Sequence, residues 1–117
     1  MKKEQIFMML FRFTPDFSHQ PTEQEKVAMK EQWGNFIGTI AISEKLVSTY
    51  QLGFEGHVIQ TDLSVTDGVL LAEKQTLGGN MVVKANSLEE ATELAKNCPI
   101  LKMGGTVEIR SIIPMES

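Results

Sequence analysis

Hydrophobic residues occupy both alternating sets of positions between Gln5 and Phe13. A run this short, which stops at Thr14-Pro15, is typical of a strand rather than a helix. One face of this strand would carry Ile6, Met8, Leu10 and Arg12, and the other would carry Phe7, Met9, Phe11 and Phe13. Because both faces are apolar, we expect helices to cover one of them and a further layer to cover the other.

A long helix is predicted next. Thr22 with Glu25 three residues later has the spacing of a capping box, and apolar residues then recur at helical spacing as far as about Ser43. Gly34 and Gly38 lie four residues apart in this helix. Glycine lowers helix propensity, so we expect this side of the helix to pack tightly on the sheet.

The second half of the chain predicts a shorter helix and three more strands. Ser87 with Glu90 repeats the capping pattern, and the amphipathic segment that follows stops before Pro99. Alternation and flanking turn residues favour strands at 57–61, 80–85 and 106–113, with the largest loop at about 62–78.

The resulting order is strand, helix, strand, strand, helix, strand, which is typical of an α+β, ferredoxin-like fold. Both helices would cover one face of an antiparallel sheet, in a single domain spanning residues 1–117. The first strand would be central and apolar on both faces. We therefore expect the second face to pack against the sheet of a second copy, which makes the protein a homodimer.

Composition narrows the function classes. The 117 residues carry a net charge of -4, so a nucleic-acid partner is not expected. The chain has no apolar stretch of about 18 residues, which argues against a membrane span and for a cytoplasmic protein. Cys98 is the single cysteine, and the two histidines lack metal-ligand spacing. We expect no metal and no cofactor.

Several short motifs, in this order and spacing, resemble the YCII-related family, and within it the DGPF-domain branch. They are Val65-Thr66-Asp67-Gly68, Leu77-Gly78-Gly79, Ser87-Leu88-Glu89-Glu90-Ala91, Cys98-Pro99 and the segment Gly104-Gly105-Thr106-Val107-Glu108-Ile109-Arg110. The resemblance implies a dimeric α/β barrel built from two ferredoxin-like halves. Some members of this family are associated with sigma factors of the extracytoplasmic-function type, and a few relatives are lyases acting on chlorinated ring compounds.

The sequence also departs from that family pattern. Val69 and Leu70 stand where Pro and Phe usually complete the DGPF signature. Relatives thought to use a His-Asp pair place the histidine on the first helix and the aspartate just before the proline of the second. Here the predicted first helix contains no histidine, and Cys98 precedes Pro99. The resemblance therefore does not supply an acid–base pair.

Two regions contain candidate chemistry. Asp67 in its Asp-Gly turn is a candidate general base, or else a carboxylate that fixes the turn through backbone hydrogen bonds. Lys74 in the same loop would pair with Asp67, hold an anionic substrate, or stay solvated. His19, in the polar segment before the first helix, is the second candidate base.

The other region joins the first and last strands. Arg12 shares the face of Met8 and Leu10, while Glu108 and Arg110 share one face of the neighbouring last strand. Two guanidinium groups and one carboxylate would then meet, either as a structural ion-pair cluster or as a binding site for a carboxylate or phosphate.

Three functions remain open from the sequence. The first is a small dimeric protein with no assignable reaction that binds a small, anionic molecule through Arg12, Lys74, Glu108 and Arg110. The second is a cofactor-free lyase or isomerase with Asp67 or His19 as base. The third, which rests on the family resemblance alone, is a regulatory domain associated with sigma-factor systems.

Overall fold

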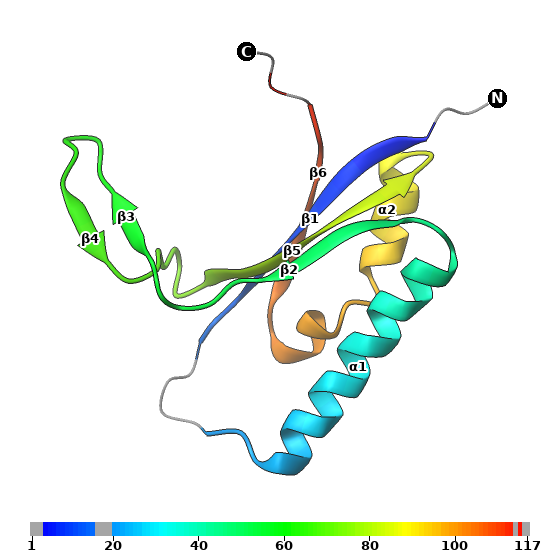
Figure 1. Ribbon diagram of the computed structural model, residues 1–117, viewed down its shortest axis with the longest axis horizontal. Coiled ribbons are helices and arrows are strands. Elements are labelled where there is room, and N and C mark those ends of the chain that lie inside the picture. Colours follow the sequence, from blue (N-terminus) through cyan, green and yellow to red (C-terminus); the bar gives the residue numbers. More distant parts are fainter. Residues whose placement is uncertain (1–3, 16–19, 114, 116–117) are drawn as a thin grey trace.

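The computed structural model of the protein describes residues 4–15, 20–113 and 115. Its elements follow the chain from the blue β1 to the orange β6 (Figure 1). They are β1 (Gln5–Phe13), α1 (Glu23–Ile42), β2 (Leu46–Gln51), β3 (His57–Ile59), β4 (Val65–Asp67), β5 (Thr76–Ala85), α2 (Leu88–Ala95), the 3₁₀ helix η1 (Pro99–Met103) and β6 (Thr106–Ser111).

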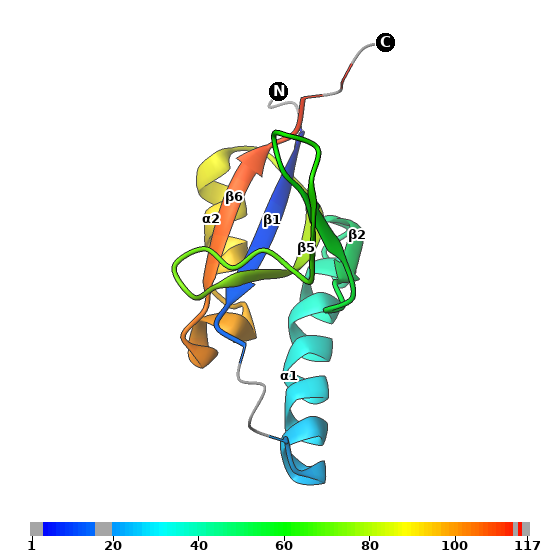
Figure 2. The same ribbon diagram turned by 90° about the vertical axis from the view of Figure 1, so that its left-hand side faces the viewer.

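Four strands form an antiparallel sheet in the order β2-β5-β1-β6, and β3 pairs with β4 in a separate hairpin. The central strand β1 places Met9 opposite Met81 of β5 and Ile109 of β6. Both α1 and α2 lie on one side of the sheet (Figure 2). This arrangement confirms the expected α+β, ferredoxin-like fold.

The helix-covered side of the sheet, here named the closed face, holds the core. Side chains from both central strands are buried there against the helices and η1. The buried set is Phe7, Met9, Phe11, Met81, Val83, Ala85, Phe36, Ile40, Ala91, Ala95, Cys98 and Ile100. Trp33 of α1 packs against this core in a T-shaped pair with Phe11, with 5.4 Å between ring centroids.

The other side of the sheet, here named the open face, has no described helix over it (Figure 2). Register places the second set of β1 side chains on it together with their cross-strand partners. These residues are Ile6, Met8, Leu10 and Arg12 of β1, Asn80, Val82 and Lys84 of β5, Ser48 and Tyr50 of β2, and Glu108 and Arg110 of β6.

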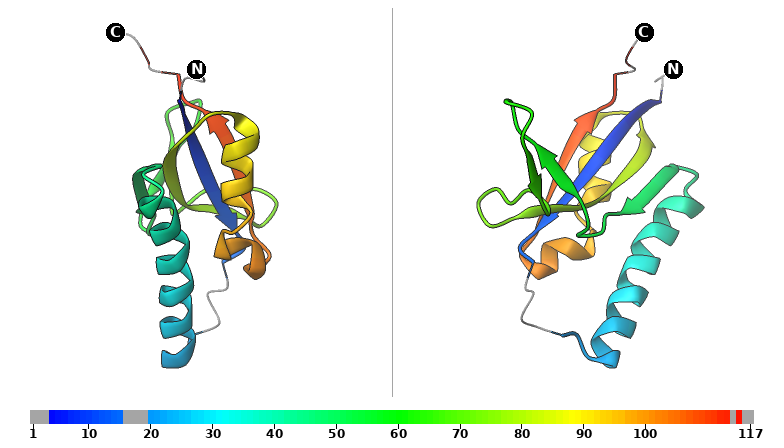
Figure 3. Two further views of the ribbon diagram at one scale, coloured as in Figure 1. Left: turned by 90° about the vertical axis from the view of Figure 1, so that its right-hand side faces the viewer. Right: turned by 60° about the vertical axis from the view of Figure 1, so that its left-hand side comes forward.

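The predicted start of α1 is confirmed. Thr22 accepts a hydrogen bond from the Glu25 backbone N–H, and the Glu25 carboxylate accepts one from the Thr22 backbone N–H, both at 3.1 Å. The expected tight packing at Gly34 and Gly38 is wrong, because a Cβ added at either would meet nothing within 4 Å. The part of α1 nearer its N-terminus extends beyond the sheet, away from any close neighbour (Figure 3).

One predicted strand has a different role. The segment 57–61 contains β3, which pairs with β4 and not with the main sheet. The second strand of the main sheet is instead β2, an edge strand whose partly exposed residues lack a clear alternation of polar and apolar positions. The expected loop at 62–78 contains β4 and the first residues of β5.

The β3–β4 hairpin, residues 56–68, is named the arm. Its base is closed by a hydrogen bond from the Gly68 N–H to the Gly56 carbonyl, and its far end by one from the Gln60 N–H to the Ser64 carbonyl. The arm projects from one end of the sheet on the side opposite the helices (Figures 1 and 3). None of the described helices is long and apolar enough to cross a membrane.

Candidate functional site

Arg12, Glu108 and Arg110 meet on the open face, and together they are named the arginine cluster. Arg12 Nη1 donates to Glu108 Oε1 at 2.6 Å, and Arg110 Nη1 donates to Glu108 Oε2 at 3.2 Å. One carboxylate therefore joins two guanidinium groups, with one oxygen for each. The backbone brings them together because β1 and β6 are hydrogen-bonded neighbours, with Arg12 opposite Thr106 and Met8 opposite Arg110.

The cluster has more positive than negative charge. The hydrogen bond from Arg12, followed by that from Arg110, lowers the pKa of the Glu108 carboxyl group below its ordinary value. Glu108 is therefore ionised at neutral pH, and with two guanidinium groups the cluster carries a net charge of +1. The Arg110 side chain is 68% exposed, against 38% for Arg12. Arg110 consequently has N–H donors accessible to an incoming anion.

The surroundings of the cluster are apolar. Glu108 lies opposite Leu10, and Arg110 lies opposite Met8, whose other cross-strand partner is Val82. Apolar side chains next to an excess cation suit a ligand that has a hydrocarbon body and an anionic head.

Asp67 is placed differently from the arginine cluster. It ends β4 on the arm, where it pairs in register with His57. The distance between His57 Nε2 and Asp67 Oδ1 is 3.8 Å, and the Asp67 side chain is 95% exposed. A general base at the mouth of a barrel is expected to be shielded from solvent, and this chain by itself gives Asp67 no such shielding.

The other candidates in that part of the chain are not brought together with Asp67. Among the residues that the structure describes, the ion-pair partner of Asp67 is His57 and not Lys74. Lys74 and Glu73 are exposed at the centre of a tight turn, with φ angles of 67° and 53°. Hydrogen bonds in both directions between Ala72 and Gln75 close this turn. The candidate base His19 lies outside the described residues.

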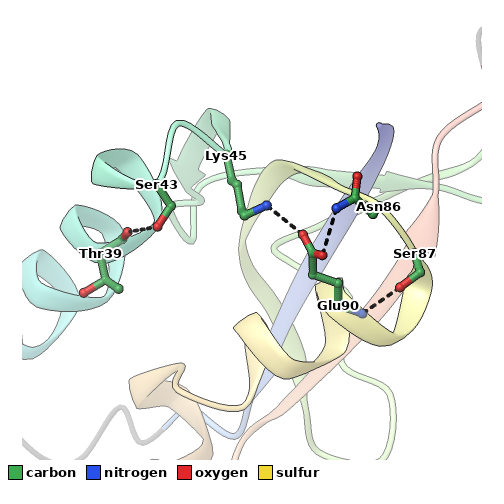
Figure 4. Close-up of polar contacts among 6 residues, drawn as sticks. All are labelled: Thr39, Ser43, Lys45, Asn86, Ser87 and Glu90. Atoms are coloured by element: carbon green, nitrogen blue, oxygen red, sulfur yellow. Dashed lines mark hydrogen bonds and ion pairs between the residues drawn. The ribbon is translucent and has the colours of Figure 1, made fainter. Parts of the chain in front are cut away.

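A second ionic cluster, which the sequence reasoning missed, lies on the closed side (Figure 4). Lys45 Nζ lies 2.7 Å from Glu90 Oε1, and Asn86 Nδ2 donates to Glu90 Oε2 at 3.2 Å. The hydrogen bond with Lys45 is the largest cause that lowers the pKa of Glu90, and the same bond raises the pKa of Lys45. Both carboxylate oxygens have partners and the charges cancel. We therefore describe this cluster as a structural tie, meaning an ion pair that holds two parts of the fold together.

A shallow groove of about 460 Å³ runs between α1 and the α2–η1 segment on the outer side of the helices. Its polar lining comes from Gln32, Asn35, Thr39, Asn97 and Lys102, which include one cation and no carboxylate or imidazole. This groove lacks a pair of groups that would give and take a proton, so it offers no acid–base chemistry.

The described residues contain neither a reactive thiol nor a group of side chains arranged to bind a metal ion. Burial raises the pKa of the Cys98 thiol to about 11, so the thiol stays protonated at neutral pH and is a poor nucleophile. No group of three or more His, Cys, Asp or Glu side chains in the described part of the chain is arranged to hold a metal ion.

The model of the YCII-related domain matches residues 6–116. The chain belongs to the YCII-related family. The match spans β1 to β6 and therefore includes every residue of the arginine cluster and of the arm. A search of curated proteins finds no match to this chain. Membership of the YCII-related family confirms the family resemblance seen in the sequence motifs.

Proposed function

We propose that this YCII-related protein is a homodimer that binds a small organic anion, a carboxylate or a phosphate ester, at the arginine cluster. The observation that carries the proposal is the sharing of one carboxylate, Glu108, between two guanidinium groups on an uncovered apolar face. A structural cluster normally balances its charges, as Lys45 and Glu90 do. The surplus cation of the arginine cluster is best explained by an anion that completes it.

Dimerisation would complete the binding site. The open face combines apolar side chains with three cationic ones, and a second copy packed on it would exclude water from the cluster. Guanidinium groups bind carboxylates and phosphates more strongly in such a shielded place. We further propose that the protein belongs to the DGPF branch, which the Asp67-Gly68 dipeptide supports, and that it is cytoplasmic, which its composition supports.

A titration tests the ligand proposal. Benzoate and phenyl phosphate, each added to ¹⁵N-labelled protein, are expected to shift the amide signals of Arg12, Glu108 and Arg110. Arg110→Met removes the accessible guanidinium and should weaken binding about tenfold or more, because a hydrogen bond to a charged group contributes about 1.5–3 kcal/mol. Glu108→Gln removes the competing carboxylate and should tighten binding.

The matched control is Lys102→Met, which removes a cation from the groove on the helical side. It should leave binding unchanged. Equal losses for Arg110→Met and Lys102→Met would show that the anion responds only to overall charge, and signal shifts confined to the helical groove would place the site there. Either result would overturn the proposed site. The dimer itself is tested by sedimentation equilibrium of the wild type, where a stable monomer at micromolar concentration would contradict it.

A further inference from the structure

The arm is a short isolated hairpin with apolar side chains in solvent. Each of its strands has only three residues, and the two are joined by the register pairs His57 with Asp67, Val58 with Thr66 and Ile59 with Val65. Ile59 is 69% exposed and Leu63 is 80% exposed. A two-stranded hairpin of this length is at best marginally stable in water unless something packs on it. Among the described residues no further strand pairs with the arm, so a partner surface would stabilise it.

The whole chain exposes more surface than a self-sufficient domain of its size. Its accessible surface is 8991 Å², whereas a folded monomer of this mass exposes about 6,400 Å². Its radius of gyration is 16.1 Å, against about 13 Å for a compact domain of this length. The excess is about 2,600 Å² per chain, or about 5,200 Å² for two chains, which is comparable to the upper end of the roughly 2,000–5,000 Å² that permanent homodimer interfaces bury in total.

Charge distinguishes the two surfaces that remain uncovered. The stretch 53–75, which contains the arm and the turn after it, has four acidic residues and one basic residue, a net charge of -3. The acidic residues are Glu55, Asp62, Asp67 and Glu73. The open face has Arg12, Lys84 and Arg110 against Glu108, a net charge of +2. The two surfaces are complementary in charge, and both carry apolar side chains.

We propose that the arm of each copy packs on the open face of a second copy of this chain, so that the contact is made twice in the dimer. This inference rests on the proposed homodimer and goes beyond it, because it assigns the arm to the partner and makes the partner part of the surroundings of the arginine cluster. A homodimer fits because one chain presents both complementary surfaces, and two-fold symmetry then uses each of them twice.

The decisive experiment places a nitroxide spin label on the arm through Leu63→Cys. The native thiol of Cys98 is buried and protonated, so the label goes to the new cysteine. Spin-labelled chains without ¹⁵N are mixed with ¹⁵N-labelled wild-type chains, so that only effects between copies are seen. We expect strong broadening of the Met8 and Val82 amide signals. Ile42→Cys, labelled in the same way at a residue 85% exposed at the end of α1, is the matched control.

Each outcome decides the question. A second sample carries the label and ¹⁵N on the same chain. If Met8 and Val82 broaden in this sample but not in the mixed one, the arm folds back on its own open face and the inference is overturned. If neither sample broadens while the protein remains dimeric, the arm has another partner, and the inference fails while the proposed dimer stands. A monomeric wild type would instead remove the proposed dimer.

A substitution on the arm gives a second readout. Ile59→Glu places a charge in the proposed contact and should raise the dimer dissociation constant about tenfold or more, since burying an isoleucine side chain contributes about 1.5–3 kcal/mol. Ile42→Glu makes the same kind of change away from the sheet and should leave the constant unchanged. If Ile59→Glu and Ile42→Glu give equal dimer dissociation constants, the inference is overturned while the proposed homodimer stands.

Discussion

Met8 and Met9 are neighbours on β1, yet they face different environments. Met9 lies on the closed face, where it is 0% exposed among core side chains from both helices. Met8 lies on the open face between Val82 and Arg110, only partly buried. Methionine, leucine and isoleucine side chains gathered on one uncovered sheet face are typical of a surface that a partner covers. The difference between the faces supports the proposal that the closed face serves folding and the open face serves association.

The two ionic clusters, one on the closed side and one on the open face, also differ from each other. Lys45 and Glu90 are 25% and 31% exposed, with balanced charges and a second donor from Asn86. The arginine cluster is more exposed and has an unbalanced positive charge. Ion-pair geometry alone would not separate them, because their shortest N···O distances are 2.7 and 2.6 Å. Charge balance is the property that separates a structural tie from a candidate binding site.

The largest effect should come from the two methionines. Met9→Ala leaves a cavity in the core and should lower the free energy of unfolding by about 2–5 kcal/mol. Met8→Ala should cost the isolated chain much less and should act mainly on the dimer. Urea unfolding at two protein concentrations far apart measures both, since the Met8→Ala loss should depend on concentration. If Met8→Ala and Met9→Ala lower the free energy of unfolding equally and independently of protein concentration, the two faces do not differ in role.

A smaller effect is expected in the turn that follows the arm. Glu73 and Lys74 both adopt positive φ, which costs a non-glycine residue roughly 1–2 kcal/mol. Replacing them with Asn and Gly, the pair preferred in such a turn, should raise the free energy of unfolding by about 1 kcal/mol. Thermal unfolding of Glu73→Asn/Lys74→Gly measures the gain. A loss of stability would show that the native side chains make stabilising contacts absent from the isolated chain.

The acid dependence of stability should separate Glu90 from an ordinary surface glutamate. Its pKa is lowered in the folded chain, so the stabilisation that it supplies is present above the unfolded value near 4.5 and is lost as pH falls through the folded pKa. Glu90→Gln should lower the melting temperature at pH 7 and flatten its fall below pH 4.5. Glu93→Gln, which breaks an exposed pair with Lys96, is the control and should change little. Identical pH profiles for the two variants would contradict the assigned tie.

The last prediction is that the Cys98 thiol does not react in the native protein. With the thiol pKa raised to about 11, roughly one molecule in a thousand is thiolate at pH 8. Ellman's reagent should therefore leave the native protein unmodified for hours and modify it within seconds in denaturant. Rapid modification of the native protein would show that the closed face opens often, and that the two faces differ less than their burial indicates.

Local patterns predicted much of this fold. The bounds of β1 follow from its apolar run and the proline after it, and the start of α1 follows from Thr22 and Glu25. Strand parity also brought Arg12, Glu108 and Arg110 to one surface, because side chains of paired strands share a face. These features depend on residues close in sequence or on a single strand pairing.

The features that were missed depend on contacts that no local pattern encodes. The edge strand β2 has one strand neighbour, so its alternation is weak, and the more regular segment around His57 resembles a sheet strand more closely. The tie between Lys45 and Glu90 joins residues 45 positions apart through the packing of α2. The exposure of Asp67 on a projecting arm likewise became visible only when the hairpin was placed in space.

The strand order has a consequence for the protein during its synthesis. β1 is made first, but both of its ladders are formed with β5 and β6, whose residues begin at Thr76 and Thr106. At about 5–20 residues per second, the ribosome needs roughly 5–20 s to supply these partners. A nascent chain must therefore carry Phe7, Met9 and Phe11 without their sheet neighbours for that time. Chaperones that bind short apolar segments have their longest opportunity at the N-terminal strand, and rare codons placed between β1 and β6 would prolong it.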